Sequence, residues 1–168
     1  MKVALVSLNQ SWEDKEANRL KVRNCFQTIA FRNMDLVIFP EMTLTGFTMN
    51  VKEHAEEAEN SATIRFFTDC ACQYGVYIGF GMILKAGIKA ANHFIIVSPE
   101  GEMCADYIKI HPFSYAGEDR FYEKGKHLTS LEIQGVPIGL SICYDLRFPE
   151  IFQALSRTDK LILNIANW

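Results

Sequence analysis

Cys143 is the residue of this 168-residue sequence best placed to act as a nucleophile. It follows the apolar run 138–142 and comes directly before a turn and a predicted helix. Its thiol would therefore lie at the carboxyl end of a strand, where open α/β sheets bind ligands. Backbone N–H groups at such a turn can lower the pKa of a thiol and hydrogen-bond an oxyanion. The alternative is a buried structural cysteine, the usual position of a free cysteine.

Glu41 and Lys109 could complete this chemistry because both lie near the ends of other apolar runs. A carboxylate desolvated at a strand end has a raised pKa and can act as a base, although Glu41 could also be a solvated loop acid or a helix cap. A buried Lys109 would need a partner for its charge, whereas on an edge strand it would point into solvent. His111 allows a Cys–His dyad, but we interpret it as the end of the strand.

The first 40 residues predict a strand, a helix and a second strand. Residues 2–8 and 35–40 are short apolar runs typical of buried strands, and residues 13–32 between them have helical spacing. The residues on or near the apolar helix face are Ala17, Leu20, Val22, Cys25, Phe26, Ile29 and Ala30. A β-α-β order predicts two parallel strands in a sheet that is covered on both faces.

A second helix is predicted over 62–74, after an irregular segment at 42–60. Ser61 is its expected N-cap and Gly75 its end. The repeating apolar residues are Ile64, Phe67, Ala71 and Tyr74. We interpret Cys70 and Cys72 as packing residues of this helix rather than as metal ligands, because their spacing is not that of a zinc site.

The remaining sequence predicts strands and one further helix. Three apolar runs separated by turn residues, at 76–84, 92–98 and 103–110, indicate an antiparallel meander. Residues 111–127 form a long polar and aromatic loop, of a length that is often functional. Further strands are expected near 128–134, 136–142 and 161–166, with a helix over 149–157 that begins at Pro149.

The amino-acid composition and net charge predict a globular single-domain protein and argue against a nucleic-acid or membrane partner. The balance of 49% hydrophobic and 22% charged residues is typical of a globular chain, and its length predicts a single domain over 1–168. The net charge is −3 and the basic residues are scattered, so we expect no nucleic-acid partner. No run is long enough to be a signal or a membrane span, and the cysteine count of five is odd, which predicts reduced thiols in the cytoplasm.

Three motifs together resemble the nitrilase-like carbon–nitrogen hydrolase superfamily. They are Phe39-Pro40-Glu41-Met42 with Thr45-Gly46-Phe47, Tyr107-Ile108-Lys109-Ile110-His111, and Ile142-Cys143-Tyr144-Asp145-Leu146-Arg147-Phe148-Pro149-Glu150. The segment Asn164-Ile165-Ala166-Asn167-Trp168 is similar to the one that follows in the family. The three motifs occur in the family's order. Within the family, Glu-Met…Thr-Gly-Phe, Cys-Tyr-Asp-Leu-Arg-Phe-Pro and Ala-Asn-Trp resemble the omega-amidase branch. A true nitrilase usually has Cys-Trp-Glu at the nucleophile, so the Cys-Tyr-Asp of this sequence favours an amide over a nitrile as substrate.

The resemblance implies a four-layer αββα sandwich, a homodimer and an enzyme that acts on linear amides without a metal or organic cofactor. It implies that Cys143 is the nucleophile, Glu41 the base and Lys109 the stabiliser of the tetrahedral intermediate. Glu118 would be a second acid, with Glu123 as the weaker candidate. The residues expected to bind substrate are Phe47, Phe113, Tyr144, Arg147 and Trp168. The expected substrate is a small carboxylate-bearing amide such as 2-oxoglutaramate, for which Arg147 or Arg120 would supply a cation.

Family members continue beyond a segment like Asn167-Trp168, so we expect a sandwich that is short at its C-terminal end. Apolar surface of the strand at 161–166 should then be exposed. Two alternatives to the omega-amidase hypothesis follow. One is an inactive fragment of the nitrilase fold that serves as a binding module, and the other is a hydrolase of a different substrate, such as an N-carbamoyl compound or deaminated glutathione.

Overall fold

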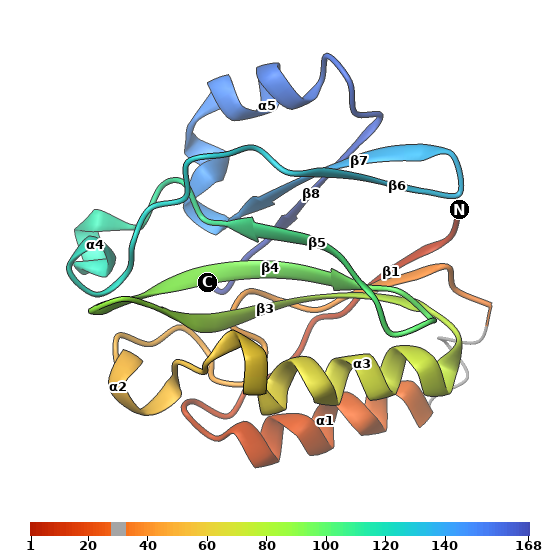
Figure 1. The fold of residues 1–168 in the computed structure, drawn as a ribbon, viewed down its shortest axis with the longest axis horizontal. Helices are drawn as coiled ribbons and strands as arrows, with labels where there is room; N and C mark the ends of the chain where they lie inside the picture. Colours follow the sequence, from red (N-terminus) through yellow and green to blue (C-terminus); the bar gives the residue numbers. More distant parts are fainter. Residues whose placement is uncertain (28–32) are drawn as a thin grey trace.

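The structure, a computed structural model, describes residues 1–27 and 33–168. The chain folds into four layers of helices and β-sheets (Figure 1). Two β-sheets face one another, α1 and α3 cover the outer face of one sheet, and α5 lies over the other. The helices are α1 (Lys15–Gln27), α2 (Val51–His54), α3 (Ala62–Tyr74), α4 (Glu118–Phe121) and α5 (Pro149–Leu155), with 3-10 turns η2 (Ala58–Asn60), η3 (Ser114–Ala116) and η4 (Cys143–Arg147). The expected αββα sandwich is confirmed.

The first sheet has five strands in the order β1-β2-β3-β4-β5. They are β1 (Val3–Leu5), β2 (Leu36–Ile38), β3 (Tyr77–Ala86), β4 (Lys89–Val97) and β5 (Met103–Ile108). The strands β1, β2 and β3 are parallel, and β3, β4 and β5 are antiparallel. Both the β-α-β unit and the antiparallel meander predicted from the apolar runs are therefore confirmed.

The second sheet has three strands in the order β6-β7-β8. They are β6 (Ser130–Ile133), β7 (Val136–Ile142) and β8 (Leu161–Ile165). The first pair is antiparallel and the second is parallel. One apolar core lies between the two sheets and another between the first sheet and α1 and α3. Because both faces of β2 are packed, all three of its residues are buried.

Helix α3 begins and ends at the predicted residues. The Ser61 hydroxyl oxygen accepts a hydrogen bond from the Ile64 backbone N–H at 3.0 Å, as an N-cap does. Gly75 ends the helix in the left-handed conformation, at φ 63°, and its N–H donates to the Ala71 carbonyl. Cys70 packs in the core as expected, but Cys72 is exposed, so only one of the two cysteines is a packing residue.

The buried face of α1 differs from the prediction. Val22 and Phe26 are buried, but Leu20 is 59% exposed, and Asn18 takes part in the buried face instead. The Asn18 amide donates to the main-chain carbonyls of Ser11 and Leu44, so its burial leaves the Nδ2 group satisfied. The predicted residues Ile29 and Ala30 lie outside the described residues.

Two strands and one loop also differ from expectation. β1 is not a buried strand: it lies at the sheet edge and Leu5 is 75% exposed. β8 is less exposed than predicted, since Leu163 and Ile165 are buried between the sheets and its other residues are partly buried. The segment 111–127 is not wholly irregular, because it contains η3 and α4.

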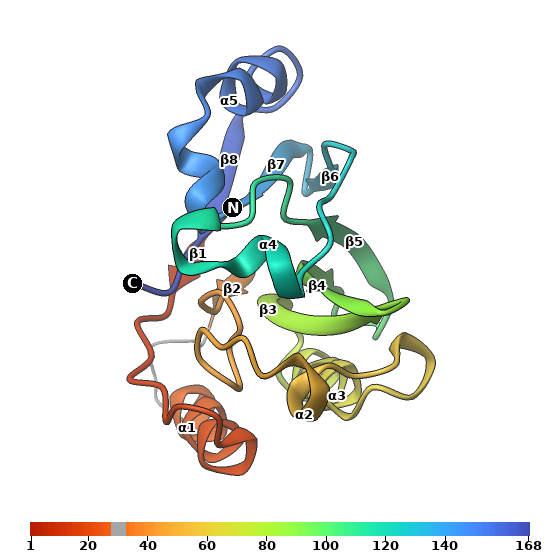
Figure 2. The same cartoon turned by 90° about the vertical axis from the view of Figure 1, so that its left-hand side faces the viewer.

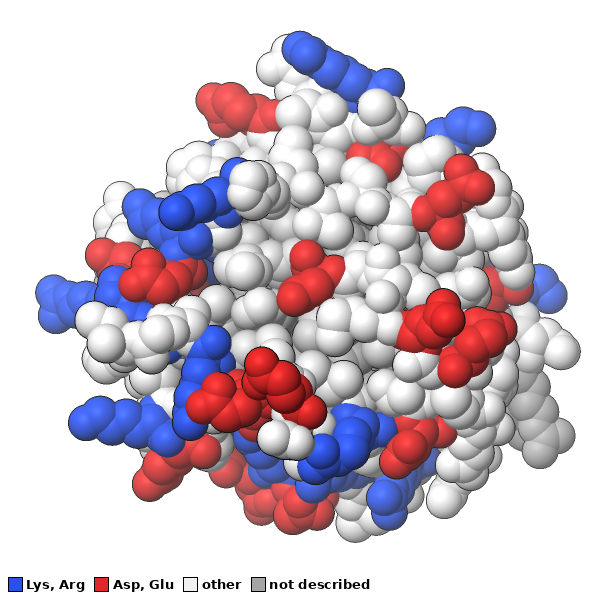
Figure 3. Space-filling model, viewed as in Figure 1, with Lys and Arg blue, Asp and Glu red and all other residues white. Residues whose placement is uncertain are grey.

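The surface carries interspersed charge. On the face shown in Figure 3, lysine and arginine side chains alternate with aspartate and glutamate, and no broad patch of one sign is visible. This agrees with the scattered basic residues of the sequence. None of the helices that the structure describes is long and apolar enough to cross a bilayer.

Candidate active site

Four of the predicted site residues lie together at the carboxyl ends of β2, β5 and β7. This end of the molecule is on the left in Figure 1 and faces the viewer in Figure 2. Glu41 follows β2, Lys109 follows β5, Cys143 opens η4 directly after β7, and Glu118 opens α4. All four side chains are buried. A buried charge is tolerated only with partners, and the contacts among these groups supply them.

Lys109 lies between the two carboxylates. Its Nζ donates to Glu41 Oε1 at 2.9 Å and to Glu118 Oε2 at 2.9 Å. Burial alone would lower the pKa of Lys109, but the charges of Glu41 and Glu118 outweigh it and the pKa is raised. The ammonium therefore stays protonated and can meet a developing oxyanion.

The two oxygens of Glu41 have different partners. Oε1 accepts from Lys109 Nζ and from Asn92 Nδ2, the latter at 2.8 Å, whereas Oε2 accepts from the Asn167 backbone N–H at 3.0 Å. Complete burial raises the pKa of Glu41 even though Lys109 opposes the shift. A carboxylate with a raised pKa is a stronger base than a solvated one, which suits proton transfer.

The Cys143 thiol lies beside Glu41, close enough for the carboxylate to act on the ionisation of the thiol. Burial and the negative charge of Glu41 raise the pKa of the thiol to about 12, so it is protonated at neutral pH and needs a base to become a nucleophile. Cys143 also has φ 47°, a conformation that costs a non-glycine residue about 1–3 kcal/mol. Such strain persists only where the surrounding structure fixes it.

Asp145 fixes the strained turn. It is fully buried, and its Oδ2 accepts from the Tyr107 hydroxyl at 2.7 Å and from the Ile142 N–H at 3.0 Å. Its Oδ1 accepts from the His111 N–H, and His111 Nδ1 lies 2.9 Å from the same oxygen. His111 therefore supports the turn through Asp145, a contact that favours its role at the strand end over a Cys–His dyad.

A second set of polar residues holds the segment that carries Glu41. Gln10 Nε2 donates to the carbonyls of Met42 and Thr43 at 2.9 and 3.0 Å, and Asn167 Nδ2 donates to Gln10 Oε1 at 2.7 Å. Reasoning from the sequence missed Gln10, Asn92 and Asp145 as members of the site. For Asn92 the sequence shows a polar pair, Asn92-His93, within β4, but this pattern does not distinguish a site residue from one that faces solvent.

The predicted substrate-binding residues surround this cluster unevenly. The Phe47 ring centroid lies 5.6 Å from Lys109 Nζ, and Phe113 and Tyr144 have ring centroids 4.9 Å apart. Phe47 and Trp168 line an open cavity of about 340 Å³, from which Trp168 projects with 81% of its surface exposed.

The candidate cations and the alternative acid lie apart from these contacts. Arg120 and Arg147 are exposed, and within the described residues neither forms an ion pair. Glu123 pairs with Lys89 rather than with Lys109. No group of three or more His, Cys, Asp or Glu residues that could hold a metal occurs in the described part of the chain.

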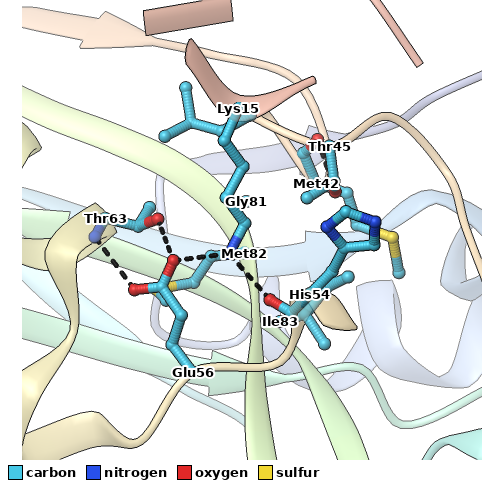
Figure 4. A pocket seen from close by; sticks show the side chains of 10 residues that line it. Lys15, Met42, Thr45, His54, Glu56, Thr63, Gly81, Met82 and Ile83 are labelled. Atoms are coloured by element: carbon cyan, nitrogen blue, oxygen red, sulfur yellow. Dashed lines mark hydrogen bonds and ion pairs between the residues drawn. The ribbon is translucent and has the colours of Figure 1, made fainter. Parts of the chain in front are cut away.

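A small cavity with both polar and apolar lining residues lies beside the segment that follows Glu41 (Figure 4). Glu56 Oε1 accepts from Lys15 Nζ and from the Thr63 hydroxyl, both at 2.6 Å, and Oε2 accepts from the Ser61 hydroxyl. Burial opposes ionisation, but these hydrogen bonds lower the pKa of Glu56 to about 2. The ion pair joins Lys15 of α1 to Glu56, which lies between α2 and η2, and the hydrogen bond from Thr63 links Glu56 to the start of α3. Met42 and Thr45 also line the cavity.

Changing Glu56 to glutamine is expected to lower stability at neutral pH by about 3 kcal/mol, because one pKa unit corresponds to about 1.4 kcal/mol. Because the pKa of Glu56 is lower in the folded state than in the unfolded state, the ionised carboxylate stabilises the fold at pH values above the unfolded-state pKa of 4.5. That stabilisation is lost as the pH falls toward 2. The gap in urea midpoint between parent and variant should therefore close between these pH values. The exposed Glu57→Gln is the matched control, and a gap independent of pH would contradict the assignment.

Comparison with known proteins gives a consistent picture. The sequence model described as carbon-nitrogen hydrolase matches residues 2–167. The chain is 32% identical to the omega-amidase YafV of Yersinia enterocolitica and 30% identical to that of Escherichia coli K12, in each case over all of this chain and 63% of the relative. It is 29% identical to a 2-oxoglutaramate amidase of Bacillus subtilis, over 81% of this chain and 53% of the relative. The chain thus spans less than two thirds of the length of these relatives.

Solved structures resemble the fold closely. A CN-hydrolase superfamily protein of Xanthomonas campestris, which carries an arsenic adduct in its active site, matches with a TM-score of 0.88 and 28% identity, over 99% of this chain and 64% of that one. An amidase of Nesterenkonia matches with a TM-score of 0.87 and 20% identity, which shows likeness of fold alone.

Proposed function

The chain belongs to the carbon–nitrogen hydrolase family, and from this premise we propose that it hydrolyses the terminal amide of a small carboxylate-bearing compound, such as 2-oxoglutaramate, to the acid and ammonia. The observation that carries the proposal is the buried contact of one ammonium with two carboxylates beside a thiol. The similarity to omega-amidases and to a 2-oxoglutaramate amidase supports the substrate class.

In the first half of the reaction, Glu41 takes the proton of the Cys143 thiol and the thiolate attacks the amide carbonyl carbon. Lys109 and the backbone N–H of Tyr144 stabilise the oxyanion that forms. The protonated Glu41 then gives its proton to the leaving nitrogen, so the C–N bond breaks and ammonia departs. A thioester between Cys143 and the acyl group remains.

In the second half, a water molecule takes the place of ammonia. Glu41, now ionised again, removes a proton from this water as it attacks the thioester carbonyl. The C–S bond breaks, the acid leaves, and the proton returns to the Cys143 sulfur. Glu118 holds Lys109 in position through both halves, since it accepts two hydrogen bonds from Nζ.

The direct test is ammonia release by the chain from 2-oxoglutaramate, glutaramate and a neutral amide of the same length. Turnover of the acidic amides in preference to the neutral one is the expected result. A well-folded chain that releases ammonia from none of these compounds would refute the proposal and favour the alternative of a binding module.

Arg147→Ala is expected to raise the KM for the acidic amide about tenfold while kcat changes little, because a lost charge-assisted hydrogen bond to a substrate carboxylate weakens ground-state binding by about 1.4 kcal/mol or more. Arg147 is the last residue of the η4 turn and is exposed, so it is available to a ligand. Arg157→Ala, another exposed arginine, is the control. An unchanged KM in the Arg147 variant would assign the cation to another residue, with Arg120 next.

We also propose that the protein is a homodimer that packs through α5 and works in the cytoplasm. The family resemblance supports packing through this helix, and the requirement for a reduced Cys143 supports a reducing compartment. Sedimentation of the chain with and without a charged substitution on α5, such as Phe152→Glu, tests the dimer.

A further inference from the structure

Asn92 is a buried asparagine on β4 whose side chain reaches both carboxylates of the site. Its Nδ2 donates to Glu41 Oε1 at 2.8 Å and to Glu118 Oε1 at 3.1 Å. Lys109 Nζ also bridges the same two side chains. Glu41 and Glu118 are therefore joined by two donors, one charged and one neutral, and Asn92 is as deeply buried as the groups that it joins.

The hydrogen bonds of Glu41 leave its two oxygens unequal. A carboxylate oxygen has about two acceptor positions. Oε1 uses both, for Lys109 and Asn92, while within the described part of the chain Oε2 accepts only the Asn167 backbone N–H. A proton that reaches Glu41 therefore finds an open acceptor position on Oε2, the oxygen that the Asn167 backbone N–H holds in place.

We infer that Asn92 is a positioning residue that, together with Lys109, occupies Glu41 Oε1 and so directs the proton of the Cys143 thiol to Oε2. In this step the S–H bond breaks, the Oε2–H bond forms, and the electron pair stays on sulfur. The inference rests on the proposed function, because it specifies how the proposed base works. Asn92 touches neither the thiol nor a substrate carbonyl, and it acts through Glu41.

The Asn92 side chain also affects the pKa of Glu41. The ionisable groups that face Glu41 are Lys109 after β5, Glu118 on α4, Cys143 on η4 and the Tyr122 phenol after α4. Burial raises the pKa of Glu41, and the hydrogen bond from Asn92 is one of the contacts that limit the rise. Without this donor, Glu41 should bind its proton more tightly and become an active base only at higher pH.

The experiment compares three replacements of Asn92 with a matched control. Asn92→Leu and the isosteric Asn92→Asp remove the donor, and Asn92→Gln retains an amide. Asn18→Leu is the control, because Asn18 is equally buried and also donates twice from Nδ2, but to main-chain carbonyls. Two readouts are used: the rate at which iodoacetamide alkylates Cys143 as a function of pH, followed by mass spectrometry of its peptide, and kcat and KM for ammonia release from 2-oxoglutaramate.

The acid limb is the pH range in which the alkylation rate of Cys143 rises as Glu41 loses its proton. Asn92→Leu and Asn92→Asp are expected to move this limb to higher pH. The shift should be larger for Asn92→Asp, because the aspartate adds a negative charge. At neutral pH, kcat should fall about 10–100-fold, because less of Glu41 is ionised and able to act as a base. The change in KM should be smaller, since Asn92 does not touch the substrate. Asn92→Gln should recover part of the loss. Asn18→Leu should lower the melting temperature without moving the limb.

The outcomes separate this inference from the proposed function. Acid limbs that coincide in all folded variants, or an equal shift in Asn18→Leu, would overturn the role of Asn92 even if ammonia is released. The expected shift in alkylation together with no ammonia release from any amide would support Asn92 as the positioning residue of the Cys143–Glu41 pair and refute the amidase proposal. If Asn92→Leu does not fold, the isosteric Asn92→Asp decides the question by the same criteria.

Discussion

Replacing Cys143 by alanine is expected to reduce ammonia release by at least about 10⁴-fold, the scale of loss when a covalent nucleophile is removed. The physical reason is that the buried cluster has no second group that could attack the carbonyl: Glu41 and Glu118 both hold hydrogen bonds from Lys109, and Lys109 is held as an ammonium. Cys143→Ser should fail almost as completely, because a hydroxyl is a weaker acid than a thiol and Glu41 would have to remove its proton.

The matched control is Cys104→Ala, because Cys104 is an exposed cysteine on β5 outside the cluster. It should leave kcat/KM unchanged. Trapping of an acyl group by mass spectrometry after rapid acid quench should show a thioester on the Cys143 peptide of the parent and on no other peptide. Retained turnover in Cys143→Ala, with a normal circular dichroism spectrum, would refute the covalent mechanism.

The β-α-β unit, the antiparallel meander and the ends of α3 could be predicted because local chemistry determines them. Ser61 and Gly75 have the side chain and the backbone freedom that a helix start and a helix end need, and the structure uses both. The three apolar runs between 76 and 110 are separated by turn residues that favour hairpins, and they pair as antiparallel strands. Such features depend on neighbours in the sequence, so the sequence displays them directly.

The polar supports of the site could not be predicted in the same way, because their partners are distant in sequence. Asn92 is 51 residues from Glu41, and Asn167 is 126 residues from it. A polar residue within a strand ordinarily predicts a side chain that faces solvent, whereas here it meets buried carboxylates. The turn that gives Cys143 its positive φ is also held by contacts across the fold, because Asp145 accepts from the Tyr107 hydroxyl and the His111 N–H.

Gly81 shows how a local signal can be overlooked. The segment Gly79-Phe80-Gly81 is too short to indicate a phosphate-binding loop. Glycine inside a strand also signals a close approach of another backbone, and this is what the structure contains. The Gly81 N–H and carbonyl contact Thr43, so β3 lies directly against the segment that carries Glu41.

Gly81→Ala is therefore expected to damage the site even though glycine carries no functional group. A Cβ atom at this position would lie 2.4 Å from the Met42 nitrogen and 2.6 Å from the Glu41 Cα. Because both are backbone atoms, the segment must move rather than rotate a side chain. We expect a loss of about 1–3 kcal/mol of stability from overpacking and, since a displacement of about 1 Å can cost 100-fold in rate, a fall in kcat of about that size.

Gly79→Ala provides the control that separates instability from displacement of Glu41. It lies on the same strand and face, but its Cβ would meet side-chain atoms of Ile38 and Phe94. Those side chains can adjust, so the variant should lose stability to a similar degree and retain kcat at temperatures where it is folded. Urea unfolding and ammonia release measured on both variants decide the matter. Equal losses of kcat in the two would mean that the close approach at Gly81 does not position the base, and a normal kcat in Gly81→Ala would show that the Glu41 segment accommodates a methyl group without moving its carboxylate.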